Sequence, residues 1–201
     1  MNYYLLNLLG DVEDPDYDNY CFAGSSPSGL GEYLRYSIEG LPLSNYYPED
    51  PLEVRVKLDD DSSGIKLASY IGNTSGNLMV KKEVVDIFRR FDLGEIEIFP
   101  FTLINHKDRI HSKDYVLVNP LGEYDCLDFE KSEMMWESDR SAIGMIMKYV
   151  LDPGKLSGVP DLFRIEKSTT DYVFSDRLVL ALQEESCTNF GFDLFPFSKY
   201  S

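Results

Sequence analysis

The sequence contains few positively charged residues for its length. It has 19 Lys and Arg against 35 Asp and Glu in 201 residues, which gives a formal net charge of −16. Nucleic-acid backbones and anionic membrane surfaces are both bound through clustered Lys and Arg. The shortage of these residues argues against nucleic acid or a membrane as a partner. A charge of this sign agrees with two other roles, which are solubility and attraction to a basic protein.

Cysteine and histidine are also scarce. The three cysteines, Cys21, Cys126 and Cys187, are odd in number and form no CxxC pair. This pattern is typical of reduced thiols in a cytosolic protein. The only histidines, His106 and His111, lie in a polar segment without a neighbouring cysteine or a nucleophile motif. We expect both to be exposed loop residues and not metal ligands or catalytic bases.

Motifs of catalytic or cofactor chemistry are missing as well. The sequence has no GxSxG nucleophile elbow and no complete GxGxxG or GxxxxGK phosphate-binding pattern. The acidic turn that begins with Asp59 and continues through Asp61 resembles the start of a calcium loop. Tyr70, however, occupies the twelfth position, where a bidentate glutamate is needed. We therefore predict no enzyme activity, no metal and no cofactor. A metal at this turn or at the two histidines is the alternative left open.

Long apolar runs are absent too. No stretch approaches the roughly 20 apolar residues of a membrane-spanning helix. The apolar run at residues 3–9 has no basic segment before it and is followed directly by acidic residues. This arrangement does not fit a signal peptide. The sequence therefore predicts a cytoplasmic protein.

The N-terminal quarter has an unusual composition within an otherwise globular chain, which is 43% hydrophobic and 13% aromatic. Its first 50 residues contain nine Asp and Glu against Arg35 alone, and 8 of the 14 tyrosines. We predict that residues 1–51 form an acidic, tyrosine-rich part packed on a main domain of residues 52–201. Tyrosines beside carboxylates are typical of a recognition surface. The alternative is that these tyrosines pack partly inward.

A pattern that occurs twice, at residues 78–101 and 172–197, indicates the architecture. Each copy predicts a strand, an amphipathic helix and a second strand that closes on Phe-Pro-Phe. Ser175 is a suitable N-cap for the second helix. We expect the prolines of the two Phe-Pro-Phe blocks to mark strand ends, and Glu97 to face solvent. The apolar helix stripes consist of Val84, Ile87, Phe88 and Phe91 in the first copy, and Leu178, Ala181 and Leu182 in the second.

The remaining hydrophobic patterns predict further short strands. Residues 52–58 alternate between apolar and polar side chains, which is typical of a half-buried strand. The other predicted strands cover residues 3–9, 20–23, 65–71, 115–118, 125–129, 145–151 and 162–166. Strands with a few short helices and no long crossovers indicate an α+β fold with a mainly antiparallel sheet.

From Lys81 onward the chain carries a series of short motifs in a defined order. They occupy residues 83–91, 97–101, 114–120, 125–133, 150–152, 162–164 and 175–184, followed by a strand that contains Gly191. In this order the chain resembles a family of small bacterial proteins, formerly a domain of unknown function and named for a myxobacterial member. That family is proposed to act as immunity proteins in polymorphic toxin systems. The resemblance covers roughly the C-terminal 60% of the chain.

The resemblance implies an intracellular, non-catalytic protein that binds and neutralises a cognate toxin from a neighbouring cell. Asp125, Asp128, Ser132 and Arg164 match the family pattern, which implies a structural role for them in a polar network or as turn caps. An acidic surface suits a basic toxin. The alternative function is a general protein-interaction or regulatory module with no toxin partner. The candidate toxin contacts are Asp14, Asp16, Tyr17, Asp18 and Tyr20.

Overall fold

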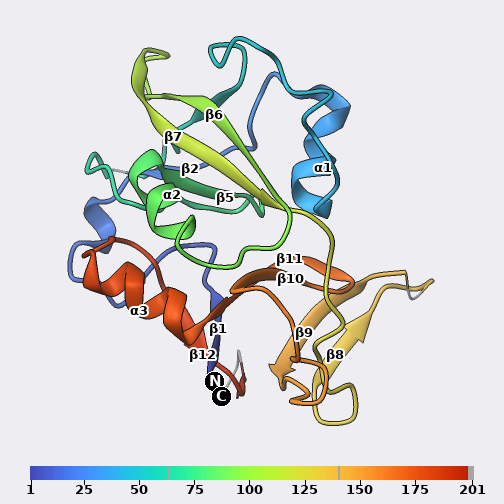
Figure 1. The fold of residues 1–201 in the computed structure, drawn as a ribbon. Helices are drawn as coiled ribbons and strands as arrows, with labels where there is room; N and C mark the ends of the chain where they lie inside the picture. Colours follow the sequence, from blue (N-terminus) through green and yellow to red (C-terminus); the bar gives the residue numbers. More distant parts are fainter. Residues whose placement is uncertain (63, 140, 199–201) are drawn as a thin grey trace.

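Two four-stranded sheets lie on either side of a pair of helices in the computed structural model, which describes residues 1–62, 64–139 and 141–198 (Figure 1). The first sheet has the order β3 (Arg55–Lys57), β6 (Ile96–Ile104), β7 (Ile110–Pro120) and β5 (Leu78–Lys81). The second has the order β10 (Leu162–Ile165), β11 (Ser168–Ser175), β1 (Tyr3–Leu6) and β12 (Phe192–Leu194). Within these two sheets only β3 and β6 pair in parallel. The predicted α+β class is confirmed.

The two predicted strand–helix–strand units are present and share one topology. The first runs from β5 through α2 (Lys82–Phe88) to β6, and the second from β11 through α3 (Asp176–Glu184) to β12. In each unit the two strands flank a third strand that is antiparallel to both. That central strand is β7 in the first unit and β1 in the second. The repeat in the sequence therefore corresponds to a repeated packing unit.

The apolar stripes of both helices bury in a common core between the sheets. Val84, Ile87 and Phe88 of α2 join Leu178 and Leu182 of α3 in one cluster of buried side chains. Ser175 caps α3, since its Oγ accepts a hydrogen bond from the amide of Leu178 at 3.4 Å. Helix α2 ends earlier than the stripe predicts, so Phe91 lies in the turn after it and is only half-buried.

Both sheets are also covered on their second face, so side chains on both faces of their central strands are buried. On the first sheet, odd-numbered residues such as Phe99, Phe101 and Leu117 face a second core. On the second sheet, Phe163 and Val173 face a third core. This third core is closed by a small sheet of β13 (Phe197–Ser198), β9 (Ile143–Tyr149) and β8 (Glu133–Trp136), which projects at the lower right of Figure 1.

The N-terminal segments cover the outer face of the first sheet. They contain two 3₁₀ helices (Tyr17–Asn19 and Gly31–Tyr33), the helix α1 (Leu34–Glu39), and β2 (Phe22–Ala23), which pairs in parallel with β4 (Gly72–Asn73). The sequence does not predict α1, which is short and has no side-chain cap at its N-terminus. Leu30, Leu43 and Val54 from this region are buried in the second core.

Two predicted strands do not form. Residues 65–71 and 125–129 make only isolated bridges. In residues 65–71 the backbone groups bond to different neighbours in succession. The amide of Lys66 donates to Asn19, that of Tyr70 to Thr188 and that of Ile71 to Met79. Residues 125–129 do lie beside one segment, residues 150–152, but form only the single bridge between Leu127 and Leu151. The strands predicted at residues 3–9 and 52–58 are present but shorter, as β1 and β3.

The expected strand end at Pro100 is also wrong, because β6 runs through this residue to Ile104. The carbonyl of Pro100 accepts the hydroxyl of Tyr47 at 2.7 Å, on the side of β6 away from β7. The nitrogen of a strand residue points to the same side as its carbonyl. The missing N–H of Pro100 therefore falls where the β6–β7 ladder needs no donor.

Candidate interaction surface

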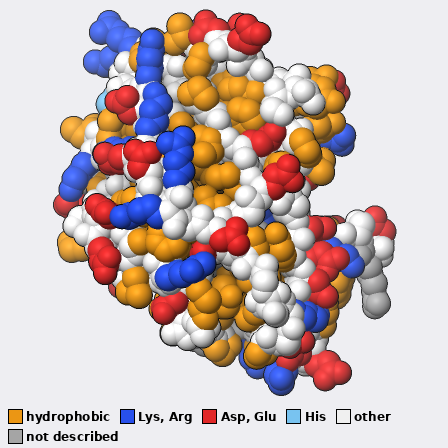
Figure 2. Space-filling view, in the orientation of Figure 1, with side chains coloured by type: hydrophobic (Ala, Val, Ile, Leu, Met, Phe, Trp, Pro, Cys, Tyr) orange, Lys and Arg blue, Asp and Glu red, His pale blue; other side chains and the backbone are white. Residues whose placement is uncertain are grey.

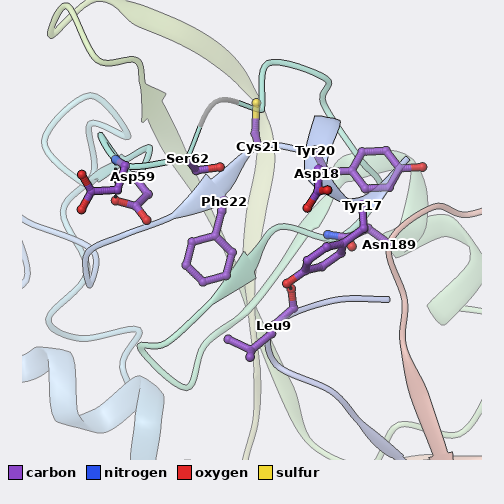
Figure 3. A pocket seen from close by; sticks show the side chains of 10 residues that line it. Leu9, Tyr17, Asp18, Tyr20, Cys21, Phe22, Asp59, Ser62 and Asn189 are labelled. Carbon is purple, nitrogen blue, oxygen red and sulfur yellow. Dashed lines mark hydrogen bonds between the residues drawn. The ribbon is translucent and has the colours of Figure 1, made fainter. Parts of the chain in front are cut away.

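The N-terminal segments enclose an open pocket of about 490 Å³ (Figure 3). Figure 3 shows the Phe22 ring within the lining, with Asp59 and Ser62 on one side of it and Tyr17, Asp18 and Tyr20 on the other. Three carboxylates line the pocket, those of Asp18, Asp59 and Asp61, and its described lining contains no Lys or Arg. The pocket is therefore acidic and partly aromatic.

Hydrogen bonds between segments far apart in the sequence hold the wall of this pocket. The amide of Asp59 donates to the carbonyl of Phe22 at 2.8 Å, which ties the acidic turn to β2. The Asn189 side chain accepts from the amide of Asp11 at 3.1 Å and donates to the carbonyl of Tyr70 at 3.0 Å. Asn189 approaches Gly10 so closely that a Cβ on this glycine would lie 2.3 Å from its Oδ1. Gly10 has a φ of +104°, so both space and backbone favour glycine there.

The five candidate toxin contacts of the N-terminal loop differ in solvent exposure and in the internal contacts of their side chains. Asp18 is exposed and has no hydrogen bond or ion pair with another described residue, whereas Tyr20 is only 5% exposed. The Tyr20 hydroxyl donates to Asp14 at 3.0 Å. Tyr17 is half-buried and donates to the carbonyl of Leu9 at 3.2 Å. Asp16 pairs with Lys66, whose hydrogen bond and charge lower the pKa of the Asp16 carboxyl.

The structure thus brings Tyr17, Asp18 and Tyr20 into the pocket wall, while Asp14 and Asp16 make internal contacts. No pattern in the sequence connects Asp59 and Asp61 to this loop. Forty residues separate the two segments, and only the pairing of β2 with its neighbours places them together. The acidic composition of both segments was the available signal.

The two histidines lie close to other side chains that can titrate. His106 Nδ1 lies 3.5 Å from a carboxylate oxygen of Asp60. His111 is half-buried on β7 and not in a loop as expected, and its Nε2 is 3.9 Å from Cys21 Sγ. Burial raises the pKa of the Cys21 thiol to about 11, so this sulfur is protonated at neutral pH. Among the residues that the structure describes, no three His, Cys, Asp or Glu side chains are grouped to hold a metal.

Three of the family-pattern residues lie in the segment before β8. Asp125 pairs with Lys155 at 2.8 Å. Asp128 accepts hydrogen bonds from the amides of Glu130 and Lys131 at 3.1 and 3.2 Å. The Ser132 hydroxyl exchanges two bonds of 3.1 Å with the backbone of residue 150. These contacts connect the segment to the strand region around β9.

Arg164 is fully buried and connects three elements. Its guanidinium donates to the carbonyls of Ser37 and Ile38 in α1 at 2.7 and 2.9 Å and to that of Pro120 in β7 at 2.9 Å. It also donates to the Asn119 side chain and to the carbonyl of residue 169 in β11. No described carboxylate contacts it. The carbonyls at the C-terminal end of α1 supply the negative potential that stabilises this charge.

Charge is distributed unevenly over the surface. Seven of the 19 Lys and Arg fall within residues 81–113. Figure 2 shows basic side chains gathered on the left of this view, over α2 and the β6–β7 hairpin, with acidic side chains between them. The net negative charge therefore comes from the rest of the molecule, including the N-terminal segments.

No described helix is both long and apolar enough to cross a membrane.

The family of the chain is identified by comparison with models of protein families. The model of a family described as an immunity protein family, Imm11, matches residues 31–195. The match extends from the residues just before α1 to those just after β12 and so includes both strand–helix–strand units. It reaches further toward the N-terminus than the motifs that begin at Lys81. A search of curated proteins gives no match.

Proposed function

Because the chain belongs to the Imm11 immunity protein family, we propose that it binds a cognate protein toxin and neutralises it without catalysis. The family match over residues 31–195 is the observation that carries this proposal. An inhibitor of this kind needs a complementary surface and no reaction centre. It acts in the cytoplasm of the cell that makes it. There it binds the toxin and blocks the toxin's functional site.

The proposed contact surface is the acidic pocket and its rim. Asp18, Asp59 and Asp61 supply negative charge without a lining Lys or Arg. Such a surface attracts a basic toxin, speeds its association and orients it. Tyr17 adds an aromatic ring at the pocket wall, which is a common anchor in protein interfaces.

The remaining candidates of the N-terminal loop support this surface from within. Asp14 accepts a hydrogen bond from the Tyr20 hydroxyl, and Asp16 forms an ion pair with Lys66. The Nζ of Lys66 lies 5.1 Å from the centre of the Tyr20 ring. We propose that Asp18 and Tyr17 touch the toxin directly. Asp14, Asp16 and Tyr20 then fix the shape of the loop that presents them.

The test is charge reversal at the pocket. The double variant Asp18→Lys, Asp61→Lys should bind the toxin that co-purifies with the wild-type chain at least tenfold more weakly, because two attractive charges become repulsive. The dependence of its affinity on salt should also become shallower. Affinity is measured by calorimetry at two salt concentrations, and protection by growth of cells that express the toxin.

The matched control is Glu184→Lys on α3, an exposed acidic residue outside the pocket lining. It should leave affinity within about twofold of wild type. Equal affinity and equal salt dependence for all three proteins would contradict the acidic-pocket surface. A wild-type chain that neither binds a toxin nor protects cells would contradict the function itself.

A further inference from the structure

Three tyrosines pack together on the surface at α1 and the loop that follows it. The rings of Tyr33 and Tyr46 are stacked, with centroids 4.2 Å apart and an interplanar angle of 10°. Tyr36 meets both edge-on, at 5.8 and 5.3 Å. With Glu32 and Arg35 they line a recess of about 270 Å³, called the tyrosine recess below. Tyr46 is 43% exposed.

The polar groups of these tyrosines are unused. None of the hydroxyls of Tyr33, Tyr36 and Tyr46 has a hydrogen-bond partner among the described residues, so each remains available to a ligand. The adjacent Tyr47 is different, because its ring stacks on Phe99 at 4.3 Å and its hydroxyl donates to Pro100. Tyr33 and Tyr36 are partly buried and, like Tyr47, pack against the second core, but their hydroxyls and the exposed Tyr46 ring face outward without an internal partner among the described residues.

The tyrosine recess is held rigidly from below. The Glu97 carboxylate accepts the amides of Leu43 and Ser44 at 2.7 and 3.0 Å, which fixes the loop that carries Tyr46. The buried Arg164 binds the last carbonyls of α1, which carries Tyr36. A surface held in advance loses less conformational entropy when it binds a partner.

The ring faces and the Glu32 carboxylate make the tyrosine recess suited to a cationic ligand. Its lining contains one acidic and one basic side chain, Glu32 and Arg35, and residues 31–50 as a whole contain four Asp and Glu against Arg35 alone. Figure 2 shows hydrophobic-class side chains over the region of α1, with both acidic and basic side chains next to them. Aromatic faces attract cations, and a neighbouring carboxylate strengthens the contact. The N-terminal loop shows this chemistry already, since Lys66 lies over the Tyr20 ring and pairs with Asp16.

We propose that the tyrosine recess receives an arginine or lysine side chain of the cognate toxin. This inference rests on the proposed function and gives that function a second contact, separate from the acidic pocket. The Glu32 carboxylate forms an ion pair with the charged group of the arginine or lysine. The rings of Tyr33 and Tyr46 contact the guanidinium plane of an arginine or the aliphatic chain of a lysine, and free tyrosine hydroxyls accept hydrogen bonds from the N–H groups of the ligand. Arg35, whose guanidinium is 5.5 Å from the Tyr36 ring centre, makes the same type of contact from within the chain and competes with the ligand.

The first test needs no toxin. The blocked tripeptide acetyl-Gly-Arg-Gly-amide is titrated into the full chain and followed by the NMR signals of the tyrosine rings, with acetyl-Gly-Gln-Gly-amide as the neutral match. The arginine peptide should shift the ring signals of the tyrosine recess, and the neutral peptide should not. Tyr46→Ala and Glu32→Gln should each weaken this binding at least threefold, and Arg35→Gln should strengthen it about twofold. Absence of these shifts, or shifts confined to the region of Asp18, would overturn the proposal.

The second test uses the toxin that wild type neutralises. Tyr46→Ala should lower toxin affinity at least tenfold, whereas Leu180→Ala, a change at a side chain 51% exposed on α3, should not. Thermal unfolding midpoints equal to wild type establish that both variants are folded. If Tyr46→Ala binds and protects as wild type does, the tyrosine recess is not a toxin contact while the proposed function stands. If wild type itself binds no toxin, the proposed function and this inference both fall.

Discussion

Asp161 shows at the residue scale how one buried charge organises its surroundings. Its carboxylate is 2% exposed and accepts bonds of 2.5 Å from Ser175 and Arg177 and one of 3.1 Å from the amide of Asp92. Burial alone would raise its pKa, but these partners together lower the pKa below 3.8. The carboxylate also lies at the N-terminal end of α3, where the helix dipole favours a negative charge. Asp161 therefore stabilises the fold in its ionised form.

A carboxyl with a lowered pKa in the folded state contributes stability above the unfolded pKa, and this stability is lost as the pH falls toward the folded value. Asp161→Asn should lower the free energy of unfolding by about 2 kcal/mol at pH 7. The difference from wild type should shrink as the pH falls below about 3.8. Urea unfolding at pH 7, 5 and 3.5 measures this. Asp86→Asn, at an exposed carboxylate, is the control. A loss that is the same at all three pH values would refute the role of the charge.

At the scale of elements, helix α3 is stabilised by one face. Leu178, Val179, Ala181 and Leu182 are buried against the two sheets, while Leu180 points away from them. Helix α2 packs into the same cluster from the other strand–helix–strand unit. A nine-residue helix is too short to be stable alone in water, so tertiary contacts must supply most of its stability.

Two leucines of this helix offer a matched comparison. Leu182→Ala should destabilise the protein by about 3 kcal/mol, because it removes a side chain only 1% exposed and leaves a cavity in the shared core. Leu180→Ala should change stability by less than about 0.5 kcal/mol, since the side chain is largely in solvent. Chemical unfolding of both variants gives the comparison. Similar losses for the two would show that the burial of α3 in the structure is wrong.

For the whole molecule, the N-terminus is joined to the C-terminal part through a sheet. Strand β1 lies between β11 and β12, with Tyr3 opposite Ser175 and Leu5 opposite both Val173 and Asp193. Tyr3, Leu5 and Leu6 are all buried. The family match begins only at residue 31, so the central strand of this sheet lies outside the matched region.

A chain that starts at residue 11 should therefore fail to fold, because it exposes two unpaired strand edges and part of two cores. A chain that lacks only Met1, which is 73% exposed, should fold like wild type. Both can be released from a cleavable fusion and compared by circular dichroism and gel filtration. A soluble, cooperatively unfolding protein from the shorter chain would contradict an essential role for β1.

The periodicity of apolar residues predicted the helices and strand faces that depend on residues close together in the sequence. The 3.6-residue stripes indicated α2 and α3, the alternation at residues 52–58 indicated the buried face of Val54, Val56 and Leu58, and Ser175 indicated a helix start. The α+β class followed from the order of these segments. These features depend on contacts within a few residues, so a sequence pattern carries them.

Other features depend on contacts between segments far apart in the chain. Glu97 was expected in solvent, yet it binds the amides of residues 43 and 44, because the N-terminal segments cover that face of β6. The bridge between Ala23 and Leu58 and the bond from the Asp59 amide to Phe22 brought Asp18 and Asp59 to one pocket. Arg164 became a buried link between α1 and the sheets. The sequence determined the two packing units and the acidic, tyrosine-rich character of the N-terminus. Only the tertiary structure decided which acids and tyrosines remain free for a partner, because internal ion pairs and hydrogen bonds engage the others first.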